Sequence, residues 1–161
     1  MNNMYEYEEN LYKEGYNFIA GTDEAGRGPL VGPVVAGCVV FPKGYKNDLI
    51  NDSKKLTEKK REQLYDIIIK DAVTYGIGIV SAKEIDELNI YEASRKAMIK
   101  AYEEANKKVK IDYLLTDAMP ITTLDIPVLK IIKGDAISVT IAAASILAKV
   151  TRDRILIDLD K

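Results

Sequence analysis

The feature that most constrains the fold is an unbroken apolar run, V-V-A-G-C-V-V-F, at residues 34–41. The run has no polar side chain and is rich in β-branched residues, which favour strands over helices. A strand that is apolar at every position, rather than at every second one, is typical of burial on both faces. The run therefore predicts an inner strand of a layered domain.

The rest of the chain predicts strands and helices in mixed order. Further strands are expected at residues 18–22, 73–80, 112–116 and 128–132. Helices are expected at residues 5–16, 58–70, 81–88, 91–107 and 137–159. Several strands come early and then alternate with helices, which indicates an α/β fold with a mixed sheet. The 161 residues suit one domain, and no linker or repeat divides them, so we expect a single domain over 1–161.

The composition excludes several kinds of chemistry. The chain has no histidine and only one cysteine, Cys38, which we assign to core packing. Ser-His-Asp triads, histidine-ligated zinc and internal disulfides are therefore excluded. Catalysis must use carboxylates, hydroxyls, amines or a bound metal.

Charge and hydropathy limit the partners. A net charge of −2 excludes nucleic-acid binding by bulk charge alone but leaves room for a local basic face. The acidic, tyrosine-rich N-terminus is unlike a signal peptide, and the most apolar stretch, 139–150, is too short to span a bilayer. We expect a cytoplasmic protein without a membrane partner.

A glycine-rich loop, G-T-D-E-A-G-R-G-P at residues 21–29, follows the first expected strand. It lacks the Lys and hydroxyl of a Walker-type loop, and Pro29 with the strand after it excludes a dinucleotide fingerprint. An acidic pair, Asp23 and Glu24, remains at the end of a strand. Because side chains alternate across a strand, both can face one site only if the chain turns there, which the glycines allow. The alternative is a solvated surface pair.

Two more carboxylates follow structured segments. Asp117 ends an expected strand, and Asp135 precedes the last helix. The alternatives are a turn residue for Asp117 and a helix N-cap for Asp135. If the four acids converge, ligands that are all oxygen favour Mg²⁺ or Mn²⁺ over zinc.

Several cationic or hydroxyl side chains are candidates for phosphate contacts. The lysines Lys54 and Lys55 lie in a predicted turn, for which the alternative is a solvated turn. The spacing i, i+4, i+7 predicts that Ser145, Lys149 and Arg152 share one helix face.

Five ordered motifs resemble those of the ribonuclease HII (type 2 ribonuclease H) family. They are D-E-A-G-R-G-P-L at 23–30, D-S-K-K-L at 52–56, L-L-T-D at 114–117, K-G-D at 133–135 and A-A-A-S-I-L-A-K-V at 142–150. The resemblance implies a ribonuclease H-like fold, with a central five-stranded mixed sheet flanked by helices. It also implies two-metal cleavage of RNA in RNA–DNA hybrids and 5′ of single ribonucleotides in duplex DNA, leaving 5′-phosphates.

The resemblance also implies roles for individual residues. The catalytic ligands of Mg²⁺ or Mn²⁺ would be Asp23, Glu24, Asp117 and Asp135. The loop that reads the ribose 2′-OH would be Gly26, Arg27 and Gly28.

Family members generally continue beyond the position of Lys161, so we expect a C-terminally shortened, monomeric catalytic domain. One alternative is a core that binds metal and hybrid with little or no turnover. Another is a related nuclease with a different substrate, such as DNA junctions, against which the Gly-Arg-Gly loop argues.

Overall fold

The computed structural model describes residues 3–26 and 32–159. Within these ranges the strands are β1 (Ile19–Ala25), β2 (Val34–Val40), β3 (Thr74–Val80), β4 (Tyr113–Asp117) and β5 (Val128–Ile131). The α-helices are α1 (Glu6–Lys13), α2 (Glu58–Asp71), α3 (Ala82–Leu88), α4 (Ile90–Lys108) and α5 (Val139–Leu159). Two short 3-10 helices, η1 (Ser53–Lys55) and η2 (Gly134–Ala136), precede α2 and α5.

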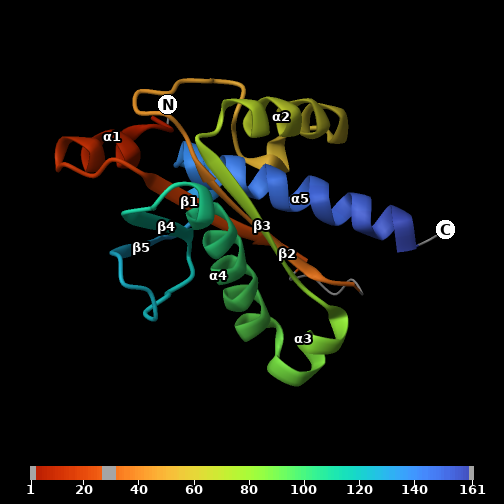
Figure 1. Ribbon diagram of the computed structural model, residues 1–161. Coiled ribbons are helices and arrows are strands. Elements are labelled where there is room, and N and C mark those ends of the chain that lie inside the picture. The colour runs from red at the N-terminus through yellow and green to blue at the C-terminus, as the bar shows by residue number, and fades with distance from the viewer. Residues whose placement is uncertain (1–2, 27–31, 160–161) are drawn as a thin grey trace.

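The five strands form one mixed sheet in the order β3-β2-β1-β4-β5. The pairings β1–β2 and β2–β3 are antiparallel, whereas β1–β4 and β4–β5 are parallel. Helix α4 packs on one face of the sheet and α5 on the other, with α2 against α5 (Figure 1). Every residue of β2 is buried, which is what its continuous apolar run predicts. The predicted five-stranded mixed sheet flanked by helices is confirmed.

Helix α5 lies very close to β1 and β2 because the strands carry glycine where the helix crosses them. A Cβ atom on Gly21 would lie 2.4 Å from the backbone nitrogen of Ile141, and one on Gly37 would lie 2.5 Å from the carbonyl oxygen of Ala144. Any larger side chain would therefore push the helix away from the sheet. This packing brings η2, which directly precedes α5, to the end of β1.

Three elements differ from the sequence-based expectation. The helix predicted at 5–16 is shorter, because α1 ends at Lys13, before Gly15 with its φ of 105°. Strand β1 continues to Ala25, three residues beyond its predicted end, because its antiparallel pairing with β2 extends to Ala25 opposite Val35. The predicted last helix begins two residues late, at Val139, because residues 134–136 form the separate turn η2.

A buried carboxylate on α1 holds the start of α5. Oε2 of Glu8 accepts hydrogen bonds from Oγ of Ser138 at 2.6 Å, from the backbone nitrogen of Thr140 at 3.0 Å and from Oγ1 of Thr140 at 2.7 Å. Its other oxygen, Oε1, is buried and has no hydrogen-bond partner among the described residues. Burial raises the pKa of Glu8, although the three donors oppose the shift. Glu8, which lies on α1, thus caps the start of α5. Its partner Ser138 is three residues after Asp135.

We expect Glu8→Ala to lower the free energy of unfolding by about 1–3 kcal/mol, because it leaves buried donors unpaired. Glu8→Gln keeps an acceptor and should lose less. Because the folded state raises the pKa of Glu8, wild type should gain stability relative to Glu8→Gln as the pH falls through that pKa. Urea unfolding at pH 7 and pH 5 measures both effects, with exposed Glu6→Gln as control. An equal difference in unfolding free energy between wild type and Glu8→Gln at both pH values would contradict a raised pKa for Glu8.

Candidate functional site

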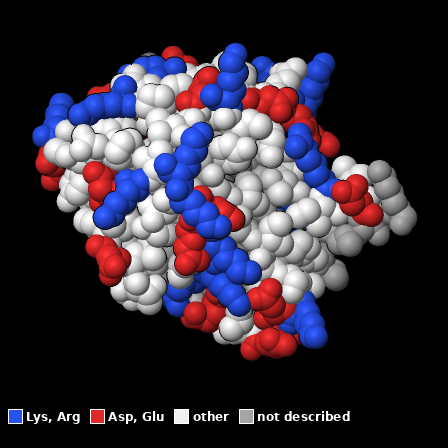
Figure 2. All heavy atoms as spheres, viewed as in Figure 1, with Lys and Arg blue, Asp and Glu red and all other residues white. Residues whose placement is uncertain are grey.

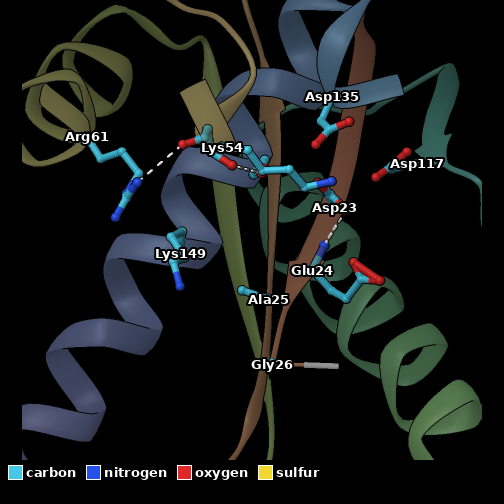
Figure 3. A pocket seen from close by; sticks show the side chains of 11 residues that line it. Asp23, Glu24, Ala25, Gly26, Lys54, Arg61, Asp117, Asp135 and Lys149 are labelled. Atoms are coloured by element: carbon cyan, nitrogen blue, oxygen red, sulfur yellow. Dashed lines mark hydrogen bonds between the residues drawn. The ribbon is translucent and has the colours of Figure 1, made fainter. Parts of the chain in front are cut away.

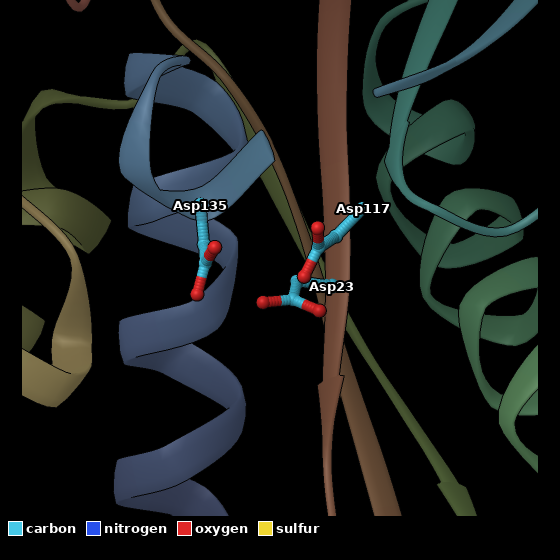
Figure 4. Close-up of side chains that lie close together, drawn as sticks. All are labelled: Asp23, Asp117 and Asp135. Carbon is cyan, nitrogen blue, oxygen red and sulfur yellow. The ribbon is translucent and has the colours of Figure 1, made fainter. Parts of the chain in front are cut away.

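Three aspartates from three separate elements meet beside the end of β1. In the parallel pairing of β1 with β4, Thr22 lies opposite Thr116, so the next residues, Asp23 and Asp117, lie side by side. Asp135 reaches them from η2. One carboxylate oxygen from each of Asp23, Asp117 and Asp135 lies within 4.8 Å of the other two (Figure 4).

Burial makes this cluster electrostatically unfavourable on its own. Asp23 is 3% exposed and Asp135 is 5% exposed. Burial, and then the charges of Glu24 and Asp117, raise the pKa of Asp23 well above its usual value. Burial is also the main cause that raises the pKa of Asp117 and of Asp135. A divalent cation would offset this repulsion, and a set of carboxylate oxygens fits Mg²⁺ or Mn²⁺.

Two turns with left-handed backbone bring Asp117 and Asp135 together. Ala118 has φ 61° and Lys133 has φ 54°, a conformation that costs a non-glycine residue about 1–2 kcal/mol. The turns are held by hydrogen bonds between them. The backbone nitrogen of Ala118 donates to the carbonyl of Ile131 at 3.0 Å, and that of Gly134 donates to Oδ1 of Asp117 at 2.9 Å. The second bond orients the carboxylate and opposes the rise in the pKa of Asp117.

The condition considered above, a turn of the chain at Asp23 and Glu24, is not met, because β1 stays regular to Ala25. The charge of Glu24 still acts on the cluster, because, in addition to burial, it raises the pKa of Asp23 and of Asp117. The backbone nitrogen of Glu24 donates to Oδ1 of Asp23 at 2.8 Å, and Glu24 lines the same pocket without belonging to the three-aspartate cluster (Figure 3). A ligand role for Glu24 stays a prediction.

The aspartates form one side of a pocket whose other side is cationic (Figure 3). The residues that line it and were predicted from the sequence are Asp23, Glu24, Gly26, Lys54, Asp117, Asp135, Ser145 and Lys149. The side chain of Lys54 extends toward the carboxylates, and its charge lowers the pKa of Asp117 and of Asp135 against the larger effect of burial. Lys54 therefore faces the site, rather than only bulk solvent.

Other predicted residues lie elsewhere. Lys55 is exposed and does not line the pocket. Arg152 is only 2% exposed, and its Nε donates to the carbonyl of Pro33 at 2.9 Å, so it does not share the open face of Lys149. The helix turn that carries Arg152 is packed against the start of β2, and the role of this residue as a phosphate contact stays a prediction. Arg27 and Gly28 lie outside the described residues.

Arg152 also lies close to Gly26. Gly26 has φ +108°, and a Cβ atom there would lie 2.6 Å from Nε of Arg152. Only glycine therefore fits where the chain passes over this arginine.

Arg61, which was not predicted from the sequence, lines the cationic side of the pocket. It lies on α2 at positions i, i+3 and i+7 with the buried residues Leu64 and Ile68. This helical period was a usable signal that Arg61 points inward.

Charges on the α4 face are mixed in sign. Figure 2 shows basic and acidic side chains beside one another over this face. Three of the contacts are ion pairs, Arg95–Glu92, Lys96–Glu84 and Lys107–Glu104. This face therefore offers no single-sign surface for phosphates.

Among the helices in the described ranges, none is long and apolar enough to cross a membrane.

Comparison with known proteins gives a consistent match. The family model for ribonuclease HII matches residues 20–161. The ribonuclease HII of Caldanaerobacter subterraneus subsp. tengcongensis is 62% identical over 150 residues, which cover 93% of this chain and 61% of that protein. The ribonuclease HII of Geobacillus sp. is 56% identical over 160 residues, covering 98% of this chain and 56% of that protein. The chain thus spans about three fifths of the length of these relatives.

Solved structures agree on the fold. The ribonuclease H2 of Pyrococcus horikoshii superposes with a TM-score of 0.76 at 31% identity, covering 89% of this chain and 75% of that one. The RNase HII in a PCNA complex from Archaeoglobus fulgidus gives a TM-score of 0.71 at 28% identity, covering 88% and 75%. An Mn²⁺ complex of Bst-RNase HIII gives 0.73 at 15% identity, covering 92% and 56%, and supports the fold alone.

Replacing one buried carboxylate should stabilise the chain when no metal is bound. Because the pKa of Asp23 is raised in the folded state, stability falls as the pH rises through that range, and Asp23→Asn removes this penalty. We expect a higher Tm for Asp23→Asn in EDTA at pH 7, by about 2–4 °C per 1 kcal/mol of relieved repulsion, with a smaller gain near pH 4.

The same variant should lose the response to metal. At 100 times its Kd, a bound cation stabilises the folded state by about 2.7 kcal/mol, so Mg²⁺ or Mn²⁺ should raise the Tm of wild type more than that of Asp23→Asn. Asp86→Asn, on the exposed surface of α3, serves as control. An equal metal response in wild type and Asp23→Asn would remove Asp23 from the ligand set.

Proposed function

Because the chain belongs to the ribonuclease HII family, we propose that it is a metal-dependent endoribonuclease that cleaves the RNA strand of RNA–DNA hybrids. The observation that carries the proposal is the convergence of Asp23, Asp117 and Asp135 on one side of a pocket whose other side is cationic. The acidic side suits divalent cations and the cationic side suits phosphates, which are the two things that phosphodiester hydrolysis must hold together.

The proposed ligands of Mg²⁺ or Mn²⁺ are the three clustered aspartates, with Glu24 as the fourth. Bound cations would supply Lewis acidity to the attacked phosphate, the attacking water and the leaving 3′-oxygen, giving 5′-phosphate products. The amide of Gly134 orients the carboxylate of Asp117, and Lys54 places a positive charge where the phosphate would enter. Lys149, on the same wall, would hold the strand further along.

We propose that the substrate range includes single ribonucleotides in duplex DNA. The loop Gly26-Arg27-Gly28 would read the ribose 2′-OH, the group that distinguishes RNA from DNA at one position. Two features of Gly26 support this role, since it lines the pocket beside the end of β1 and its backbone adopts φ +108°. The roles of Arg27 and Gly28 rest on the family motif alone.

A monomeric, cytoplasmic enzyme is part of the same proposal. The second candidate is a core that binds metal and hybrid with little turnover. The cleavage experiment below separates it from the first.

We expect wild type to incise a labelled RNA–DNA hybrid in Mg²⁺ or Mn²⁺, and Asp117→Asn to lose at least a hundredfold in rate, since a ligand supplies several kcal/mol of charge stabilisation. The measurement is single-turnover cleavage resolved by gel. Asp125→Asn, an exposed residue, should cleave like wild type. Hybrid binding without incision would favour the second candidate, and incision of all-DNA duplexes would favour a different nuclease.

Arg27→Ala should impair junction recognition more than general affinity. One phosphate contact among several contributes little to binding, whereas placing the ribose is needed for in-line attack. On duplex DNA with one ribonucleotide, kcat/KM should therefore fall by a larger factor than Kd rises. Parallel losses in the two quantities would show that Arg27 serves binding alone.

A further inference from the structure

One charged group in the pocket has no part in the metal site. Arg61 lines the pocket with Lys54 and Lys149, on the side away from the aspartates (Figure 3). Lys149 lies 3.7 Å from Asp153, so part of its charge is already neutralised. Arg61 forms no ion pair with any residue in the described ranges, unlike Arg95 and Arg154, which pair with Glu92 and Glu62.

The guanidinium of Arg61 is held in a fixed position. Its Nη1 donates to the carbonyl of Ser53 at 3.2 Å and to that of Leu56 at 2.7 Å. The same turn is tied to α5, because Oγ of Ser53 and Oγ of Ser145 are 2.8 Å apart and hydrogen-bonded. A side chain fixed in this way loses little rotamer freedom when it binds a ligand.

The same guanidinium is left incompletely hydrogen-bonded. Nε of Arg61 is buried and has no hydrogen-bond partner in the part of the chain that the structure describes. A buried donor without an acceptor destabilises the folded state, and a partly buried guanidinium without an anion destabilises it further. An anion in the pocket would pair with the charge of the guanidinium, and the planar fork of arginine suits a phosphate.

We propose that Arg61 binds a backbone phosphate of the nucleic-acid strand, next to the phosphate that Lys54 and cations bound by the aspartates would hold. This inference rests on the proposed function, since it places the substrate strand across the pocket from the acidic side to Arg61. It makes Arg61 a substrate-binding residue that the family motifs did not mark.

Binding without chemistry tests the assignment. The probe is a fluorescent RNA–DNA hybrid in EDTA, with Kd measured by anisotropy at several salt concentrations. Arg61→Ala should weaken binding about five- to tenfold and lower the slope of log Kd against log salt by about 1, as expected for one lost phosphate contact. Lys60→Ala removes an exposed charge on the same helix, outside the pocket, and should change neither quantity.

A purely structural role must be separated, because Arg61 also holds the turn that carries Lys54. If Arg61 acts only through Lys54, the double variant Arg61→Ala/Lys54→Ala will bind no worse than Lys54→Ala. If Arg61 holds its own phosphate, the two losses will multiply. Arg61→Lys should keep the salt slope that Arg61→Gln loses, and this pair replaces Arg61→Ala if that variant has no cooperative melt.

Two failures are distinguishable. If wild type does not incise the hybrid with metal present, the proposed function fails. If wild type incises and Arg61→Ala binds the hybrid as Lys60→Ala does, only the assignment of Arg61 is overturned. A double variant equal to Lys54→Ala overturns it as well.

Discussion

The close contact of α5 with β1 and β2 is the constraint on which the site depends. It exists because Gly21 and Gly37 carry no side chain where the helix crosses, so that the backbone of α5 at Ile141 and Ala144 lies against the sheet. With the helix this near, the turn before it delivers Asp135 to within reach of Asp23. The packing around the cluster must compensate for the repulsion among the aspartates. The cap from Glu8 fixes α5 in place at the same end.

The sequence predicted the layers of the fold better than the ends of its elements. The apolar run at 34–41 was enough to place a strand with both faces covered, and the family identified from five motifs is confirmed. The extension of β1 could not be predicted, because a glycine-rich segment favours a turn. Pairing with β2, a contact that the local sequence does not show, keeps the strand regular. Arg152 shows the same limit, because helical spacing does not say which segment covers a given turn.

Within the site, the motifs identified the acidic residues but did not show how these residues are arranged in space. Convergence of Asp23 and Asp117 follows from parallel pairing of strands that are far apart in sequence, and Asp135 is placed by left-handed turns that no propensity favours. Glu24 lines the same pocket as the three aspartates but does not belong to their cluster. Arg61 could have been predicted from the helical period on α2, although it belongs to none of the five motifs.

The pairing of β1 with β4 also has a consequence for how the molecule is made. Ile19 pairs with Tyr113, and Asp23 meets its partners only after residues 117 and 135 have been synthesised. Contacts of such high sequence separation form late and slow folding, since the intervening loop must close first. A nascent chain released before residue 135 lacks the third aspartate of the cluster. Assembly of the cluster is therefore tied to completion of the sheet and of the turn before α5.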